Sequence, residues 1–452
     1  MWKINIKSFF SIVISKIIIK LSRALFKGGT NFPGKVALKL DRNILKCICK
    51  DFKVILVTGT NGKTTTTSMI YNIIKGNEKY VITNNTGANM LPGIVSCFVE
   101  HFSFSRCCET KYAVIECDEA NVRLFTKFVT PEVITITNLF RDQLDRYGEV
   151  YTTLQKIVSG IKNVPMTNLV LNGDESLLGD LDLPNRTLYY GFKCSTNNAK
   201  TIDINADAKF CKKCKSPYKY NYLTYNHLGD FYCENCGYRR PDLDYAVEEI
   251  REQTSQGSLV LINGKEYYIN QPGTYNIYNG LCAYSVAKVC GIEDPVIFHS
   301  LKNQQSSFGR QESIQIDDKN LKIILVKNPA GYDQAINTVA LNKGEFNLSV
   351  LLNDNYADGR DVSWIWDVKF EKLASLNINK IMVSGVRLYD MAVRLKIAGV
   401  PDDKFVMCEN YENLFNEIKT CNNNIIYVFA TYTAMISFRK FLNSKGYIKK
   451  LW

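Results

Sequence analysis

The stretch Lys53-Val-Ile-Leu-Val-Thr-Gly-Thr-Asn-Gly-Lys-Thr-Thr65 decides the fold class of this chain. It starts as an apolar run typical of a buried strand, turns at two glycines, and continues as a helical pattern to about Lys75. A strand, a glycine-rich turn and a helix in this order form a phosphate-binding loop. Backbone N–H groups of such a loop point at phosphate oxygens, and the helix N-terminus adds partial positive charge. The stretch therefore predicts a nucleotide-binding α/β domain.

The side chains of this loop have predicted roles in binding a nucleoside triphosphate. Lys63 would neutralise the β- and γ-phosphates, and the Thr64 hydroxyl would hold Mg²⁺. The spacing of the two glycines and Lys63 is tighter than in the commonest phosphate loops. The residues predicted to contact the nucleotide are Thr58, Gly59, Thr60, Asn61, Gly62, Lys63, Thr64 and Thr65.

Further apolar, β-branched runs follow the loop and are separated by segments of helical character. Their alternation predicts a largely parallel, doubly wound sheet. A second series of runs after residue 312 predicts a separate, smaller C-terminal α/β domain. The expected strands are 112–117, 133–137 and 169–171 in the first series, and 323–326, 346–352, 380–384 and 425–430 in the second. We divide the chain into an N-terminal segment (1–52), a nucleotide-binding central domain (53–309) and a C-terminal domain (310–452).

Size and composition are those of a folded protein with two or three domains. The chain has 452 residues, of which 46% are hydrophobic and 22% are charged. Its formal net charge of +12 favours anionic partners without choosing among nucleotides, nucleic acid and acidic lipids. The 15 cysteines and the lack of an evident secretion signal indicate reduced thiols and a cytoplasmic location.

The N-terminal segment combines apolar runs with positive charge. Between residues 4 and 26 the apolar runs alternate with Lys7, Lys16, Lys20 and Arg23. A membrane-spanning helix needs about 20 mostly apolar residues, and two of these lysines interrupt this one. Two interpretations stay open: an amphipathic helix with a basic face on a membrane surface, and a helix packed on the first domain. A turn-rich connection through residues 28–30 and Pro33-Gly34 is expected to follow.

Four cysteines mark an inserted module at residues 205–240. Cys211-x-x-Cys214 and Cys233-x-x-Cys236 are separated by 18 residues, the spacing of a zinc ribbon. Four thiolates complete a tetrahedral Zn²⁺ site and leave no open position for catalysis, so the predicted role is structural. Disulfide bonds between these cysteines do not suit a reducing compartment. No basic stripe with interleaved aromatics extends beyond the ribbon, so we expect no nucleic-acid partner.

Seven segments between residues 54 and 312 resemble, in order, the Mur ligases and folylpolyglutamate synthetases. They are the loop at 58–65, Asn85-Thr-Gly-Ala-Asn89, Val114-Ile-Glu-Cys-Asp-Glu119, Asn138-Leu-Phe-Arg-Asp-Gln-Leu-Asp-Arg-Tyr-Gly148, Leu171-Asn-Gly-Asp174, Gly273-Thr-Tyr-Asn-Ile-Tyr-Asn279 and Gly309-Arg-Gln-Glu312. Gln143 and Tyr275 stand where the family usually has histidine. The resemblance implies the Mur-ligase fold and ATP-dependent activation of a carboxylate as an acyl phosphate, which an amine then attacks.

The same resemblance implies roles for individual residues. Glu116 would bind Mg²⁺ together with Thr64, because a hard ion prefers oxygen ligands. Lys63 and Glu116 are the residues of this domain expected to take part in phosphoryl transfer. Further contacts to the nucleotide or the acceptor are expected from Asn85, Asn276, Asn279 and Arg310.

Two departures from most Mur ligases narrow the resemblance. Only 57 residues precede Thr58, too few for the usual UDP-binding domain, so we expect a lipid-linked substrate. The zinc ribbon and two C-terminal stretches resemble the MurT branch of the family. These stretches are Lys327-Asn-Pro-Ala-Gly331 and Leu351-Leu-Asn-Asp-Asn-Tyr-Ala-Asp-Gly-Arg-Asp-Val-Ser-Trp-Ile-Trp-Asp367.

The MurT branch implies a division of labour in peptidoglycan biosynthesis. A GatD-like glutaminase partner would release ammonia, and this chain would amidate the α-carboxylate of D-glutamate in the lipid II stem peptide. The expected product is D-isoglutamine, and the expected place is the cytoplasmic face of the cell membrane. None of the three histidines lies near a Gly-x-Cys-x-Gly nucleophile turn, so the chain has no convincing glutaminase site of its own. We expect a heterodimer.

The resemblance also implies that an aspartate of the C-terminal signature completes the Cys–His site of the partner. Asp358 is favoured over Asp361, since a carboxylate can orient a catalytic histidine. Without that role, Asp358 would belong to an ordinary turn and Asp361 would cap a helix. Trp364 and Trp366 are expected to be core residues or interface anchors.

Three other functions stay open at this stage. One is a ligase that adds an amino acid, as folylpolyglutamate synthetases do. Another is a nucleic-acid-binding NTPase with a zinc ribbon. A third is a scaffold that retains ATP binding only for its structure, although the intact Lys63, Thr64 and Glu116 argue against it.

Overall fold

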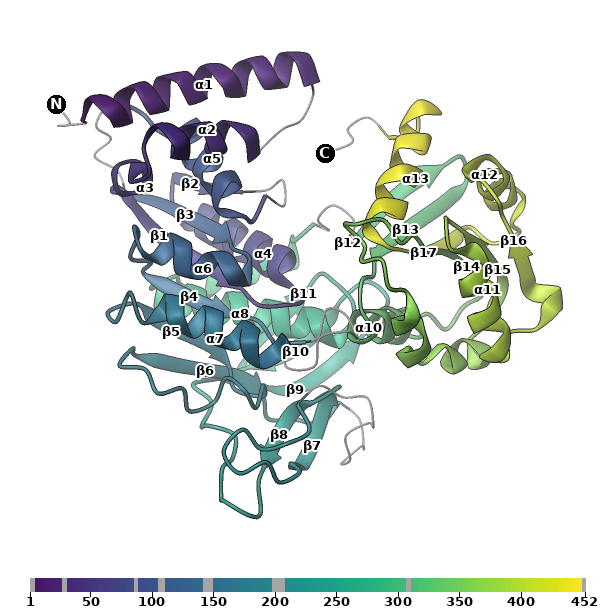
Figure 1. Ribbon diagram of the computed structural model, residues 1–452. Helices are drawn as coiled ribbons and strands as arrows, with labels where there is room; N and C mark the ends of the chain where they lie inside the picture. Colours follow the sequence, from purple (N-terminus) through teal and green to yellow (C-terminus); the bar gives the residue numbers. More distant parts are fainter. Residues whose placement is uncertain are drawn as a thin grey trace.

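The computed structural model describes residues 5–26, 31–84, 88–104, 110–140, 149–196, 208–305 and 310–448. Two sheets organise these residues, and helices cover both faces of each sheet (Figure 1). A nine-stranded sheet holds the chain up to residue 305, and a six-stranded sheet holds the chain from Arg310 onward. A short hairpin projects from the nine-stranded sheet.

The strands of the first sheet are β1 (Phe52–Thr58), β2 (Tyr80–Thr83), β3 (Lys111–Glu116), β4 (Val133–Ile136), β5 (Asn168–Asn172), β6 (Thr187–Phe192), β9 (Tyr245–Gln253), β10 (Ser258–Ile262) and β11 (Lys265–Ile269). Their order is β11-β10-β9-β6-β5-β4-β1-β3-β2. The sheet is parallel from β9 to β2, while β10 and β11 pair in antiparallel fashion. The expected strands at 112–117, 133–137 and 169–171 are confirmed, because a parallel strand buried on both faces is a continuous apolar run.

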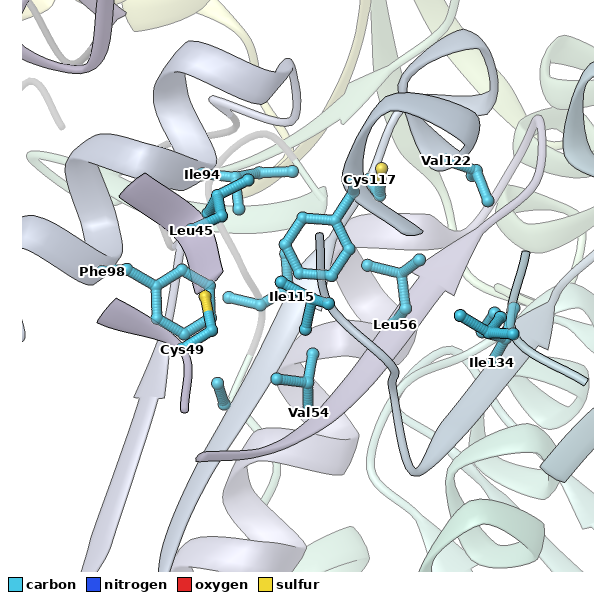
Figure 2. Close-up of a cluster of buried hydrophobic side chains, with 14 of the residues drawn as sticks. Leu45, Cys49, Val54, Leu56, Ile94, Phe98, Ile115, Cys117, Val122 and Ile134 are labelled. Atoms are coloured by element: carbon cyan, nitrogen blue, oxygen red, sulfur yellow. The ribbon is translucent and has the colours of Figure 1, made fainter. Parts of the chain in front are cut away.

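Alternate side chains of each strand point to opposite faces, so both faces bury apolar residues. On one face Val54 and Leu56 belong to a cluster with Leu45 and Phe98 (Figure 2). On the other face Ile55 and Val57 belong to a second cluster. The first face carries α1 (Ile6–Phe26), α2 (Asn31–Leu40), α3 (Ile44–Ile48), α5 (Leu91–His101), α6 (Glu119–Thr126) and α7 (Glu149–Ile161), and the second carries α4 (Lys63–Asn77), α8 (Thr274–Val289) and α9 (Asp294–Lys302).

The predicted turn at Pro33-Gly34 is wrong, because both residues lie within α2. Proline is tolerated in the first turn of a helix, where its missing N–H has no partner to lose. Gly34 lies so close to α5 that an added Cβ atom would be 1.7 Å from the carbonyl oxygen of Pro92. The glycine therefore allows two helices to approach closely. The remainder of the predicted connection, residues 28–30, lies outside the described residues.

The second sheet has the order β12 (Arg310–Ile316), β13 (Lys319–Leu325), β17 (Ile425–Ala430), β14 (Phe346–Leu351), β15 (Ile378–Ser384) and β16 (Phe405–Met407). It is parallel from β13 to β16, and the four expected strands are confirmed. One face carries α10 (Pro329–Val339), α11 (Leu388–Ile397) and the 3₁₀ segments η1 (Ser363–Asp367) and η2 (Phe370–Ser375). The other face carries α12 (Tyr411–Thr420) and α13 (Tyr432–Ser444), and a short η3 (Asp402–Lys404) precedes β16.

Candidate functional site

The phosphate loop connects β1 to α4 at the carboxyl end of the first sheet. Gly59 and Gly62 adopt positive φ angles of 122° and 83°, which side chains other than glycine rarely allow. A Cβ atom at Gly59 would also lie 2.4 Å from the Thr137 hydroxyl oxygen. No described side chain caps the first turn of α4. Its N–H groups are therefore available to an anion, as the sequence predicts.

Asn138, at the end of β4, holds the loop from the neighbouring strand. Its carbonyl oxygen accepts a hydrogen bond from Thr60 N at 2.9 Å, and its side-chain oxygen accepts one from Asn61 N at 2.9 Å. Its side-chain nitrogen donates to Asn61 O at 3.1 Å. Asn138 lies in one of the family segments, but we predicted no role for it. Only the adjacency of β1 and β4 reveals the contact.

Lys63 lies folded against the loop that precedes it. Its ammonium donates to the carbonyl oxygens of Gly59 and Thr60 and pairs with Glu119 at 2.8 Å. The side chains of Lys63 and Glu119 are only 11% and 17% exposed. The cation is thus held inside the loop, where the γ-phosphate of a bound nucleotide would be a further partner. We did not predict the role of Glu119.

Glu116 ends β3, directly beside the last residues of β1. It is 5% exposed, and its carboxylate accepts a hydrogen bond from the Asn89 side chain at 3.1 Å. The half-buried Thr64 belongs to the first turn of α4. A carboxylate and a hydroxyl at one edge of the sheet suit Mg²⁺, which prefers oxygen ligands. The predicted acceptor contact, Asn85, lies outside the described residues, as does Gln143.

A cleft lies beside the loop, with an empty volume of about 810 Å³ that includes the open solvent at its mouth. Asn61 and Gly62 line it from the loop, and Tyr275, Asn276 and Asn279 line it from the start of α8. The structure therefore brings the loop together with Asn276 and Asn279, both of which were predicted to contact the nucleotide or the acceptor. An added Cβ at Gly62 would lie 2.3 Å from the Asn279 side-chain oxygen, which shows how closely these parts meet.

The C-terminal domain closes the other side of the same cleft. Lys327 and Asn328, which follow β13, line it together with Gln334 of α10. The Asn328 side chain donates to the Asn61 side chain at 3.3 Å, so the two domains meet at the phosphate loop. The backbone of Arg310 begins β12, but its side chain lies outside the described parts of the structure.

The four cysteines of the inserted module converge. Their sulfur atoms all lie within 4.8 Å of one another, with two pairs at 3.5 and 3.4 Å. A tetrahedral ion with Zn–S bonds of about 2.3 Å separates its sulfurs by about 3.8 Å, so the cluster has the dimensions of a zinc site. Lys215 and Gly237, each directly after a Cys-x-x-Cys turn, both have positive φ angles, so the two turns match. All described cysteines are free thiols, so the disulfide alternative is not supported.

Two buried polar pairs join this ribbon, with its hairpin β7 (Lys219–Tyr225) and β8 (Leu228–Tyr232), to the central sheet. His227, between the strands, pairs with Glu175 at 2.8 Å, and both side chains are fully buried. Glu175 also accepts a hydrogen bond from Leu139 N, next to Asn138. Arg240 pairs with Asp174 at 2.9 Å. Burial raises the pKa of Asp174, although Arg240 acts in the opposite direction.

Asp358 is held against the N-terminus of α13. Its carboxylate accepts hydrogen bonds from Thr433 N at 2.7 Å, from the Thr433 hydroxyl, and from Asn355 N at 3.2 Å. The residue is 8% exposed. Asp361 is more exposed and accepts hydrogen bonds from the backbone N–H and the hydroxyl of Ser363, the first residue of η1. The N-cap of η1 is Val362, so Asp361 lies one residue before the predicted cap position.

Aromatic side chains of the same signature segment divide between core and surface. Trp364 is buried in the core of the C-terminal domain, whereas Trp366 is half exposed. Tyr356, two residues before Asp358, is 92% exposed. A large exposed aromatic next to an ordered carboxylate is typical of an interface.

Comparison with known proteins decides the family. The Mur ligase middle domain matches residues 57–238, and the MurT ligase C-terminal domain matches residues 325–435. The chain is 40% identical to the lipid II isoglutaminyl synthase (glutamine-hydrolyzing) subunit MurT of Streptococcus pneumoniae, over 93% of this chain and 94% of that protein. The chain belongs to the MurT family of Mur ligases. The subunit of the same name from Staphylococcus aureus is 35% identical over 87% of this chain and 89% of that protein.

Solved structures agree with the predicted fold. MurF from Acinetobacter baumannii superposes with a TM-score of 0.66 at 17% identity, over 91% of this chain and 80% of that chain. A pseudomurein peptide ligase type C from Methanothermus fervidus gives 0.64 at 20% identity, over 91% and 84% of the two chains. The predicted Mur-ligase fold is therefore confirmed, and this member of the MurT family is a ligase.

Proposed function

We propose that this chain uses ATP to amidate the α-carboxylate of D-glutamate in the lipid II stem peptide, and that a GatD-like glutaminase partner supplies the ammonia. In this proposal residues 53–309 bind ATP, residues 310–452 bind the partner, and the ribbon at 205–240 holds Zn²⁺. The reaction takes place at the cytoplasmic face of the membrane that contains lipid II. Curated relatives at 40% and 35% identity are named as subunits of such a synthase.

The observation that carries the proposal is the cleft at the phosphate loop. Its loop side has the features of an ATP site, and its other wall is the domain that matches the MurT ligase C-terminal model. Lys63 and Glu116 lie at the carboxyl ends of the neighbouring strands β1 and β3, where the loop begins. The phosphates and the reacting carboxylate would meet there.

The chemistry follows from these positions. A carboxylate oxygen attacks the γ-phosphorus, and ADP leaves; ammonia then attacks the acyl carbon, and phosphate leaves with that oxygen. Lys63 would offset the charge that develops on the transferred phosphoryl group, while the loop N–H groups orient it. Mg²⁺, which Glu116 and Thr64 would hold, supplies further charge neutralisation.

Asp358 suits the histidine-orienting role in the partner's glutaminase site. An aspartate in that role must be held in a fixed orientation and must keep one acceptor position for the imidazole N–H. A carboxylate has about four such positions, and Thr433 and Asn355 use three of those of Asp358. Tyr356 and Trp366 would supply apolar contact around it.

Mass spectrometry of lipid II tests the proposal. Incubation with ATP, Mg²⁺, ammonium and this chain is expected to lower the mass of lipid II by about one unit, because NH₂ replaces OH. The Lys63→Ala variant should lose this shift, and the control Lys162→Ala, which changes an exposed lysine directly after α7, should retain it. An unchanged mass, with ATP hydrolysed only when an amino acid is supplied, would instead establish an amino-acid-adding ligase.

A further inference from the structure

The side of α1 that packs on the protein combines apolar and polar contacts. Ile12 and Ile19 join the core cluster, and beside them Ser8 donates to Asp41, Ser11 donates to the carbonyl oxygen of Ala37, and Ser15 is fully buried. Lys16 also turns inward and donates to the carbonyl oxygen of Phe102 at 2.6 Å. The basic residue that we expected on the outer face of the helix is therefore used to attach it to the protein.

The outward side of α1 is apolar instead. It presents one stripe of side chains at helical spacing: Ile6, Phe10, Ile14, Ile17 and Leu21. Their exposed fractions run from 37% at Ile14 to 75% at Ile6. Phe9 widens the stripe by contact with the exposed Phe104. In Figure 1, α1 is the outermost element on its side of the first sheet, and no described element lies over its outer side.

The exposed charges of α1 itself are positive, at Lys7 and Lys20, while the carboxylate of Glu100 in α5 acts on the inward-turned Lys16. Asp41 is the only acidic residue between residues 5 and 50, and it is buried against Ser8. The exposed basic residues of the same span are Lys7, Lys20, Lys35, Lys39, Arg42, Lys46 and Lys50. An apolar stripe flanked by exposed lysines on a predominantly basic segment complements an acidic lipid surface, where headgroups attract the cations and acyl chains accept the apolar side chains.

We propose that the outer face of α1 docks the protein on an anionic lipid surface, with the helix lying in the plane of the interface. No helix in the described part of the chain is both long and apolar enough to cross a membrane. The inference deepens the proposed function, since it names the surface that meets the membrane of the lipid-linked substrate. A helix already packed on the protein binds without the cost of folding at the membrane.

Co-sedimentation of the full chain with vesicles tests this docking. Vesicles contain phosphatidylglycerol and phosphatidylcholine, or phosphatidylcholine alone, and no lipid II, so the outcome does not depend on the proposed reaction. Binding is expected only with the anionic vesicles and should weaken as salt is raised. Phe10→Ser combined with Ile17→Ser should weaken binding about tenfold or more. Lys7→Glu combined with Lys20→Glu should also weaken it.

A matched control removes two exposed apolar side chains elsewhere. Met166→Ser combined with Ile397→Ser should bind vesicles like the unaltered chain, and all variants should keep their melting temperature because the sites are exposed. Equal binding by both serine pairs, or no binding by the unaltered chain, would overturn the proposal. A dimer in solution that only Phe10→Ser with Ile17→Ser dissolves would overturn it too, because a second copy would then cover the stripe.

Discussion

The phosphate loop and the C-terminal signature segment, 351–367, present their functional side chains in opposite ways. At the loop, Lys63, Asn138 and Glu119 contact the loop or one another, and the uncapped N–H groups of α4 remain for a ligand. In the signature segment, Asp358 is held by its own domain while Tyr356 is directed to solvent. The first site is built to receive a small molecule, and the second has the character of a protein interface.

This difference implies that the two halves of the proposed reaction can be separated. Changes at the loop should impair amidation whatever the source of nitrogen. Changes in the signature segment should impair only the reaction that needs the partner. The predictions below test that separation, from the largest expected effect to the smallest.

Asp358→Asn should reduce glutamine-driven amidation at least about 100-fold, because an amide no longer holds the partner's histidine in its reactive tautomer. Amidation driven by ammonium should stay within about threefold, since the phosphate loop is untouched. Rates with each nitrogen source, measured in the reconstituted complex, give the comparison. Asp361→Asn is the matched control, and an equal loss in that variant would contradict the choice of Asp358.

Asn138→Ala should lower kcat/KM for ATP about 10- to 100-fold with both nitrogen sources. The change removes the side-chain bonds to both backbone groups of Asn61 and loosens the loop. Steady-state kinetics at varied ATP measure the effect. Asn168→Ala, which removes a similar bond to Glu132 O at the opposite end of the sheet, should leave kcat/KM for ATP unchanged. If both variants behave alike, the hydrogen bonds from Asn138 to Asn61 have no special role in ATP binding.

Tyr356→Ala and Trp366→Ala should each weaken binding of the glutaminase about tenfold, as truncation of an exposed aromatic anchor does at an interface. Calorimetric titration measures the dissociation constant, and ammonium-driven amidation serves as the check on folding. Met166→Ala, another exposed apolar side chain, should bind the partner normally. Unchanged affinity in both aromatic variants would place the interface elsewhere.

Asp333→Asn should raise the stability of the C-terminal domain by up to about 3 kcal/mol at pH 7.5, because a pKa raised by about two units costs about 1.4 kcal/mol per unit. Burial raises the pKa of Asp333 to about 6, so its charged form above that pH disfavours the folded state. The gain should shrink to less than about 1 kcal/mol at pH 4, where the carboxyl is protonated in the folded chain and partly protonated in the unfolded chain. Urea unfolding at both pH values measures it, and an equal gain at the two pH values would contradict the pKa shift.

The central strands and the zinc ribbon could be predicted because their signals are local. Residues 54–57 are a continuous apolar run, and the cysteine spacing alone indicates the ribbon. The turn at Pro33-Gly34 was predicted wrongly, because the same glycine serves a helix contact with Pro92. The outward apolar face of α1 was also missed, since its pattern does not show which side packs on the protein.

Contacts between distant parts of the chain could not be predicted. Two contacts depend on which strands are neighbours: the pairing of Lys63 with Glu119 and the hydrogen bond that Asn138 accepts from Asn61 N. The buried pair of His227 and Glu175 joins an inserted hairpin to the central sheet, and neither residue belongs to a motif with that meaning. The meeting of Asn328 with Asn61 depends on the packing of the two domains.

The most direct test of the account follows one oxygen atom. Lipid II whose D-glutamate α-carboxylate carries ¹⁸O is incubated with this chain, ATP, Mg²⁺ and ammonium, and the released phosphate is analysed by mass spectrometry. Activation as an acyl phosphate predicts that each amidation transfers one ¹⁸O to phosphate. Amidated lipid II accompanied by unlabelled phosphate would contradict the account, because the carboxylate would then not have attacked the γ-phosphate.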